Sequence, residues 1–199
     1  MKSNVCKIDQ GTRDLGAILN ECEKVAAYNN LSHKQALQMR LLCEEIDGML
    51  PNVIDKFEGE LWFDFEDGVC KVNLSIQIPK FNTEKKDELI NIAKNKKNAA
   101  AVGIVGKIRD SIENFFLDES MKEALNTSNS FFPQSTGFSE GVDYSYLWSL
   151  EQYKAAVKPD EQSKEWDELE KSVIASVADD VIVSVKANQA DIVIVKKFA

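Results

Sequence analysis

Residues 41–50, LLCEEIDGML, place carboxylates and a glycine inside a pattern that otherwise predicts an apolar helix. Glu44 and Gly48 are four residues apart, so on a helix they lie on one face, about one turn from each other. A carboxylate that lines a cleft can act as a general base and take a proton from a reacting group. Glu44 is therefore the candidate catalytic residue of this sequence.

The same charges also fit a solvent-exposed helix edge. At about 100° per residue, Glu44 and Gly48 fall on the stripe of Leu37 and Leu41. Arg40 precedes Glu44 by four residues. This spacing allows a modest surface ion pair, weaker in this order than with the acid first. The residues alone leave both interpretations open.

A second group of residues could bind an anion. The run AAAVGIVGKI contains Gly103 and Gly106 and follows a basic stretch, KNKKN, that ends with Lys97 and Asn98. A helix N-terminus beside lysines attracts negative charge because its backbone N–H groups carry partial positive charge. Small residues equally let two backbones pack closely, so the two glycines also fit a packing role.

Composition limits the classes of partner. The chain has 199 residues, 44% of them hydrophobic, which is enough to bury a core in one domain, or in one domain with an appendage. Its net charge of −9 disfavours a broad contact with a phosphate backbone. Nucleic acid is therefore not expected as a partner.

The four cysteines are widely spaced, and the only histidine is His33, so we predict no metal-ligating cluster. We expect Cys6, Cys22, Cys43 and Cys70 to be small buried hydrophobic residues in a reducing compartment. The N-terminus is polar, and no window approaches the roughly 18 to 20 apolar residues that span a bilayer. A cytoplasmic protein without a membrane segment is expected.

The hydrophobic pattern predicts the elements that would position these residues. A short strand is expected at 4–9, followed by a helix that Thr12 or Asp14 caps. That helix is expected to stop near 29–30, where two asparagines follow its last apolar residues.

A second helix and a hairpin come next. Ser32 stands where an N-cap belongs, and the helix is expected to end near Leu50, because Pro51 disfavours helical geometry in the residue before it. Apolar and polar residues then alternate on both sides of Asp67 and Gly68, a strong signal for a type I′ hairpin.

The remaining regular patterns lie later in the chain. Helical spacing recurs in 83–93 and 99–116, and the chain closes with a helix at 166–178 and a Val/Ile-rich hairpin at 179–198. This order predicts an α+β fold, a two-layer sandwich with helices on one face of a mostly antiparallel mixed sheet.

Residues 117–165 are the least regular part, rich in Ser, Asn, Gly and aromatic residues. We predict one domain over 1–199 with an insertion at about 117–165, in which 146–157 forms a helix. The insertion could pack on the domain's own surface. Alternatively, it contacts a partner or a second copy of the chain, because exposed aromatic patches mark interaction sites.

This element order, with a helix pair before a hairpin and a Gly-containing helix before the last hairpin, resembles the ATP-binding domain of the GHKL superfamily. That superfamily contains histidine kinases, Hsp90-like chaperones and gyrase-type ATPases. The chain looks most like the compact version in bacterial anti-sigma-factor serine kinases. The resemblance covers about residues 4–116 and 166–198 and implies a Bergerat-like fold.

In that family the second helix carries an N-box, E-x-x-x-N. Its Glu orients or deprotonates the attacking group, and its Asn holds the Mg²⁺ bound to the phosphates. The matching frame here puts Glu44 on the Glu position and Gly48 on the Asn position. The resemblance implies a catalytic Glu44 and a lost metal ligand, although Asp47 beside it offers oxygens that hard cations accept.

The two other family motifs match less well. The D-x-G-x-G motif, whose Asp binds the adenine amino group, is absent from SIQIPKFN, where Gln77 or Asn82 would have to substitute. The Gly-rich start of the helix after the ATP lid matches Gly103 and Gly106. The resemblance implies that these glycines, with Lys97 and Asn98 before them, approach the phosphates.

Three functions from different classes follow. The first is a regulatory or protein-binding module with a weakened or altered ATP site, whose cofactors are ATP and Mg²⁺ or none. Its partner is a regulatory protein or a second copy of the chain. The second is an active Mg-ATP-dependent ATPase or serine kinase of anti-sigma-factor type, with Glu44 as base and Asp47 in the metal role. The third is a structural or assembly scaffold.

Overall fold

The structure is a computed structural model that describes residues 1–9, 11, 14–53, 57–77, 104–109, 111–112, 147–157, 172–186 and 189–198. Its strands form one sheet in the order β1-β2-β3-β6-β5-β4, and all the described pairings are antiparallel. The strands are β1 (Cys6–Asp9), β2 (Glu58–Glu66), β3 (Val69–Gln77), β4 (Leu147–Ser149), β5 (Asp180–Lys186) and β6 (Gln189–Lys197).

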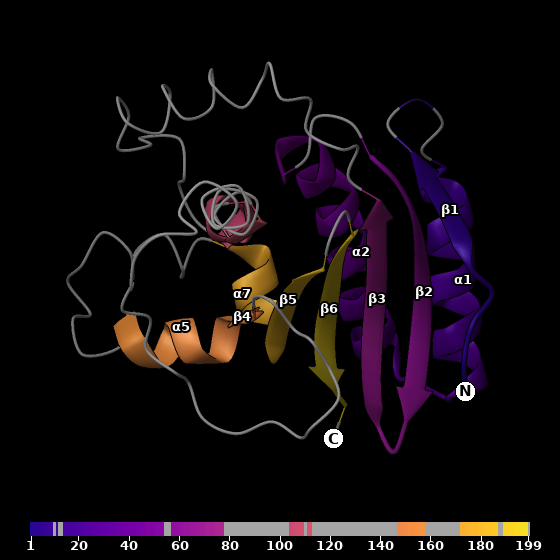
Figure 1. The fold of residues 1–199 in the computed structure, drawn as a ribbon. Coiled ribbons are helices and arrows are strands. Elements are labelled where there is room, and N and C mark those ends of the chain that lie inside the picture. The colour runs from indigo at the N-terminus through magenta and orange to yellow at the C-terminus, as the bar shows by residue number, and fades with distance from the viewer. Residues whose placement is uncertain are drawn as a thin grey trace, which may run out of the picture.

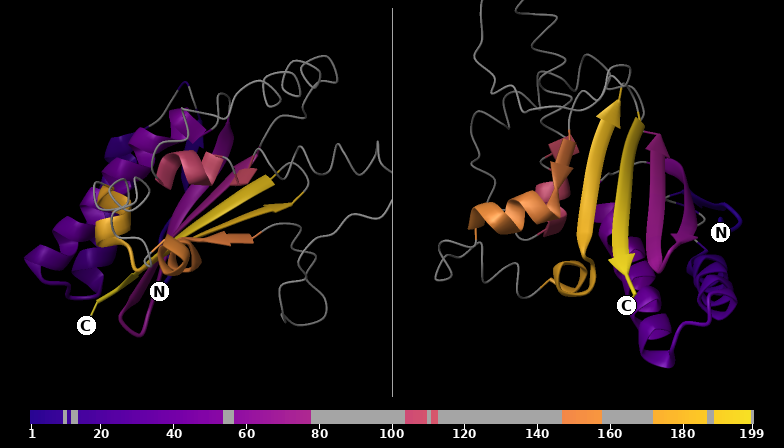
Figure 2. Two further views of the ribbon diagram at one scale, coloured as in Figure 1. Left: turned by 90° about the vertical axis from the view of Figure 1, so that its left-hand side faces the viewer. Right: turned by 90° about the horizontal axis from the view of Figure 1, so that it is seen from below.

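Helices cover one face of this sheet (Figures 1 and 2). The helices are α1 (Leu15–Tyr28), α2 (His33–Val53), α5 (Leu150–Val157) and α7 (Val173–Val177). Residues 104–109 and 111–112 are also helical and are called the 104–112 segment below. The prediction of an α+β fold is confirmed, whereas the sheet is not the mixed one that was expected, because every pairing among the described strands is antiparallel.

The predicted N-caps begin the first two helices. Asp14, one of the two candidates, accepts a hydrogen bond from the backbone N–H of Ala17 at 3.0 Å. Ser32 Oγ accepts one from the N–H of Gln35, whose side chain in turn accepts one from the Ser32 N–H at 2.9 Å. Each pairing satisfies backbone donors that a helix start leaves without partners, so the sequence places both helix starts correctly.

The end of α2 was predicted wrongly. The helix continues through Pro51 to Val53 instead of stopping near Leu50. Pro51 lacks the N–H that would bond the carbonyl of Asp47, but this loss is confined to the last turn. Leu50 is buried in the core, and this packing offsets the preference of a pre-proline residue for extended backbone.

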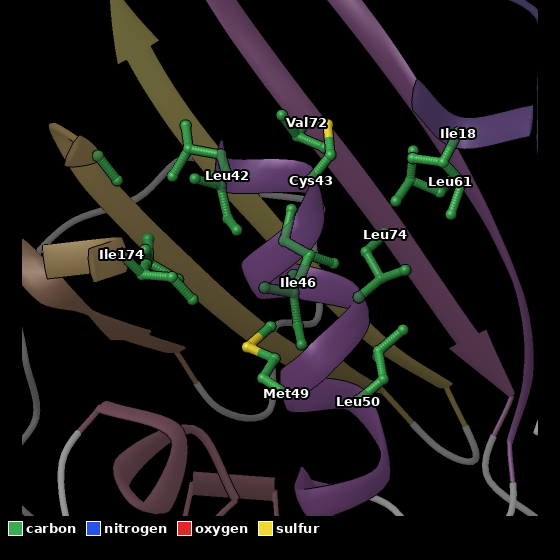
Figure 3. Close-up of a cluster of buried hydrophobic side chains, with 14 of the residues drawn as sticks. Ile18, Leu42, Cys43, Ile46, Met49, Leu50, Leu61, Val72, Leu74 and Ile174 are labelled. Carbon is green, nitrogen blue, oxygen red and sulfur yellow. The ribbon is translucent and has the colours of Figure 1, made fainter. Parts of the chain in front are cut away.

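The first hairpin follows its predicted pattern. Asp67 has φ of 49° and Gly68 has φ of 76°, the positive values that a type I′ turn needs at both central positions. Alternate residues of β2 and β3 are buried against the helices, and Figure 3 shows Val72 and Leu74 facing side chains of α2. The buried strand residues of this hairpin are Leu61, Phe63, Phe65, Cys70, Val72, Leu74 and Ile76.

Later segments differ in detail from their predictions. Within 146–157, only the part from Leu150 is helix α5, because residues 147–149 pair with β5 as the edge strand β4. Ile104, Ile108 and Ile112 form the buried side of the 104–112 segment, while Val105 is half-buried and packs against the same core. The predicted helix at 83–93 lies outside the described residues, as do residues 166–171 of the helix predicted at 166–178, whose described part contains α7.

All four cysteines are buried and free, as the sequence predicts. They come from β1, α1, α2 and β3, so they are spread through the layer where helices meet the sheet. Within the described ranges, no helix is both long and apolar enough to span a membrane.

Candidate functional site

The elements to which the resemblance assigns a nucleotide site meet at one end of the molecule. β3 ends at Gln77, which pairs with Glu58 at the start of β2, and α2 reaches its C-terminal end on the same side of the molecule (Figure 1). The 104–112 segment lies in the helix layer together with α2, and Ile104 and Met49 belong to one hydrophobic core (Figure 2). The candidate residues that the structure describes, Glu44, Asp47, Gly48, Gln77 and Gly106, can therefore be placed relative to one another.

Glu44 lies on the outward face of α2, away from the sheet. Its side chain is 41% exposed and accepts a hydrogen bond from Arg40 Nε at 3.0 Å. Arg40 also contacts Glu23 of α1 at 3.3 Å. The structure thus shows the surface ion pair that the spacing allows. The Glu44 carboxylate is paired with the guanidinium group of Arg40.

Gly48 is exposed on the same outward face. A Cβ atom built at this position would meet none of the described atoms within 4 Å. The face therefore carries an open notch one turn after Glu44, where the family has a metal-holding asparagine. Glycine contributes no side-chain oxygen there. Gly48, which stands at the Asn position of the N-box, therefore cannot hold a metal ion as that Asn does.

Asp47 lies on a different flank of α2. It comes seven residues after Arg40, so the two share a flank, and Arg40 contacts Glu23 of α1. One carboxylate oxygen, Asp47 Oδ1, is shielded from solvent. Asp47 therefore lies on the flank of α2 that carries Arg40, and its role as a metal ligand in place of the Asn stays a prediction.

Glu45, next to Glu44 in the chain, is a further carboxylate on α2. It is half-buried, and at about 100° per residue it lies roughly 200° around α2 from Asp47, on the opposite flank. Met49, four residues later, shares this flank and points toward the side of α7, where Figure 3 shows Ile174. A helical wheel could have pointed to Glu45. If Leu42, Cys43 and Ile46 are taken as the buried face, the wheel places Glu45 at the edge of that face.

The residue that follows Glu45 at N-box spacing is Met49, which is 3% exposed. A thioether buried in the core is not an oxygen ligand, and hard cations such as Mg²⁺ bind oxygen. Neither possible frame on α2, Glu44 with Gly48 or Glu45 with Met49, supplies the carboxylate and amide pair of the family.

Gln77, the candidate adenine contact, is separated from α2 by the sheet. Its neighbour Ile76 is buried against the helices, so Gln77 points to the other face. There its amide donates to Gln189 at 3.1 Å, and Gln189 donates to Ser75 at 2.9 Å and to Asp191 at 2.8 Å. This network lies on the face of the sheet away from Glu44, so Gln77 does not line a site with it.

Of the candidate phosphate-binding residues, Gly106 is described. It is buried within the helical segment 104–109, which agrees with the packing role that was one of two alternatives. Lys97, Asn98 and Gly103 lie outside the described residues, as does Asn82.

The described residues do not fit magnesium bound in the family's manner. Gly48 has no side-chain donor atom, and Met49 offers a buried sulfur. Among the His, Cys, Asp and Glu side chains in the described part of the chain, no three come together as a metal site. No phosphoryl-transfer step is therefore derived from these residues.

A scan against protein-family models and searches against curated proteins and solved structures found no significant match to this chain.

Proposed function

We propose that this chain is a histidine kinase-like ATPase-fold protein that works as a regulatory or protein-binding module with an altered ATP site. The order of its elements supports a Bergerat-like fold: two helices precede the β2 and β3 hairpin, and a second hairpin closes the chain. Four free, buried thiols are consistent with a reducing cytoplasmic compartment.

The main support for the proposal is which N-box side chains α2 has and where they point. The N-box frame keeps its glutamate but lacks an oxygen ligand at Gly48, where a side chain would have open space. A general base must reach the proton that it removes. Glu44 instead stands on the outward face, 41% exposed and paired with Arg40.

A protein is the favoured type of partner. The outward face of α2 exposes Leu37 and Leu41, although a solvent-facing helix side is ordinarily polar. Exposed apolar side chains that lie together mark interaction surfaces. The altered site and the exposed leucines thus sit on the same helix, which would let a partner be bound without turnover of a nucleotide.

Isothermal titration calorimetry with ATP tests the altered site. We expect the wild-type chain to bind ATP no tighter in magnesium than in EDTA, because Gly48 offers the metal no ligand. Gly48→Asn is expected to make the affinity magnesium-dependent, and Gly48→Ala is the control that adds a side chain without oxygen. A magnesium-dependent gain of about tenfold or more in the wild-type chain would contradict the proposal.

A further inference from the structure

Four positions form one stripe along the outward face of α2, and they are called the α2 outer stripe below. They are Leu37, Leu41, Glu44 and Gly48, and all four are exposed. Leu37 is 51% exposed and Leu41 is 39% exposed. The intervals of four, three and four residues are those of the a and d positions with which one helix packs on another.

The two ends of the stripe are complementary in shape. Gly48 leaves a notch, since a Cβ there would meet none of the described atoms within 4 Å, while Leu37 projects a large side chain. A two-fold axis passing between residues 42 and 43 would set a second copy of α2 antiparallel to the first. Leu37 of each copy would then lie over Gly48 of the other, and Leu41 of each over Glu44 of the other. Such self-complementarity is what a two-fold interface requires.

The charges of α2 favour the same antiparallel arrangement. Its basic side chains, Lys34 and Arg40, lie in the first half of the helix, and its acidic ones, Glu44, Glu45 and Asp47, lie in the second half. This distribution is opposite to the one that the helix macrodipole prefers. An antiparallel second copy would place each basic half beside an acidic half, whereas a parallel copy would place like charges together.

We propose that the α2 outer stripe is the contact between two copies of this chain, packed antiparallel about a two-fold axis. The contact uses the outward face of α2, so it leaves free the flank of Glu45 and Met49 that faces the side of α7. It depends on the shape and charge of this one helix.

Sedimentation velocity of the full chain over a range of concentrations tests whether this contact forms. The wild-type chain is expected to be in a monomer–dimer equilibrium. Leu41→Glu should weaken the dimer by about tenfold or more, because it buries a charge in place of a leucine. Tyr28→Glu is the matched control, since Tyr28 is 71% exposed on α1 and lies outside the stripe, and it should leave the dimer unchanged.

Exchanging the charges of Arg40 and Glu44 distinguishes a specific dimer from nonspecific association. Arg40→Glu alone should weaken the dimer, since it places acid beside the acidic half of the other copy. Adding Glu44→Arg to that variant restores opposite charges both within and between copies, and the dimer should recover. A dimer that strengthens or stays unchanged in the single variant would overturn the electrostatic part of the proposal.

Cysteine cross-linking with diamide tests the orientation. The native cysteines are all buried, so an introduced surface thiol is the reactive one. In the antiparallel dimer the two copies of Leu37 are about 16 Å apart along the axis, too far for a disulfide. Leu37→Cys alone and Gly48→Cys alone should therefore stay uncross-linked, while a mixture of the two should cross-link.

Three results would overturn the proposal. The first is a chain that remains monomeric at every concentration, and the second is a dimer that Leu41→Glu leaves intact. The third is efficient self-cross-linking of Leu37→Cys, which would show a parallel pair. Circular dichroism of each variant would confirm that the fold is kept, as expected for substitutions at exposed positions.

Discussion

Replacing Gly48 by alanine should stabilise the protein, which is unusual for a substitution in a candidate functional site. Gly48 lies inside α2, where glycine is a poor helix former because its backbone loses the most freedom on folding. An added methyl group would meet none of the described atoms within 4 Å, so it brings no steric cost.

The size of the effect follows from the helix interior. Alanine is more favourable than glycine there by about 0.5–1 kcal/mol. For a chain of this length, that gain corresponds to a rise of about 2 °C in the midpoint of thermal unfolding. Glycine at this position therefore costs helix stability.

Urea unfolding followed by tryptophan fluorescence measures this gain, at the lowest usable protein concentration so that self-association does not contribute. Gly59→Ala is the control in the opposite direction, because its Cβ would collide with the backbone carbonyl oxygen of Ser75 in the neighbouring strand. A loss of stability in Gly48→Ala would refute the reasoning, since it would mean that a neighbour fills the notch.

Other substitutions and treatments test the surrounding structure. Glu44→Gln should change the free energy of unfolding by no more than about 0.5 kcal/mol, because its ion pair is largely exposed; a loss of several times that in urea unfolding would contradict this. Hydrogen bonding from Lys24, at 2.6 Å, lowers the pKa of the Glu21 carboxyl below its usual value of 4.5. The stability that this bond supplies is present above the unfolded-state pKa and lost as the pH falls through the folded-state pKa, so Glu21→Gln should destabilise at neutral pH and the difference should shrink in acid. Burial raises the pKa of Cys70 to about 12, and a hydrogen bond with Cys22 together with burial raises that of Cys43. Mass spectrometry should find these thiols unmodified by iodoacetamide in the native protein at neutral pH and modified after unfolding; rapid native labelling would show that the core opens readily.

Local signals in the sequence predicted much of the fold. Asp14 and Ser32 cap helices by side-chain bonds that depend on neighbouring residues alone, and the turn at Asp67 and Gly68 is determined by backbone preference. Such features can be read without knowing the rest of the structure. The continuation of α2 through Pro51 could not be predicted in this way. The burial of Leu50 in the core outweighs the local preference of a pre-proline residue for extended backbone.

The strand β4 shows a second limit of local reasoning. Residues 147–149 are followed directly by a helical pattern, and three residues carry too little alternation to predict a strand. They become one by pairing with β5, more than thirty positions later in the chain. Sheet edges of this kind are set by tertiary contacts rather than by propensity.

The candidate site was predicted in part. The sequence correctly put Glu44 and Gly48 on one face of a helix with Leu37 and Leu41, but it could not tell that this face points to solvent. Gln77 belongs to the candidate site because the resemblance places the D-x-G-x-G motif at the end of its strand. Period-two alternation, counted from buried Ile76, places the side chain on the far face of the sheet.

Phosphate release from ATP most directly tests the proposal that the altered frame on α2 supports no metal-dependent phosphoryl chemistry. The full chain, incubated with ATP and magnesium, is predicted to release no phosphate above the buffer rate. The decisive comparison is with Glu44→Gln and Glu45→Gln, prepared identically. Release by the wild-type chain that either substitution abolishes would contradict the account, because it would show a working catalytic carboxylate on α2.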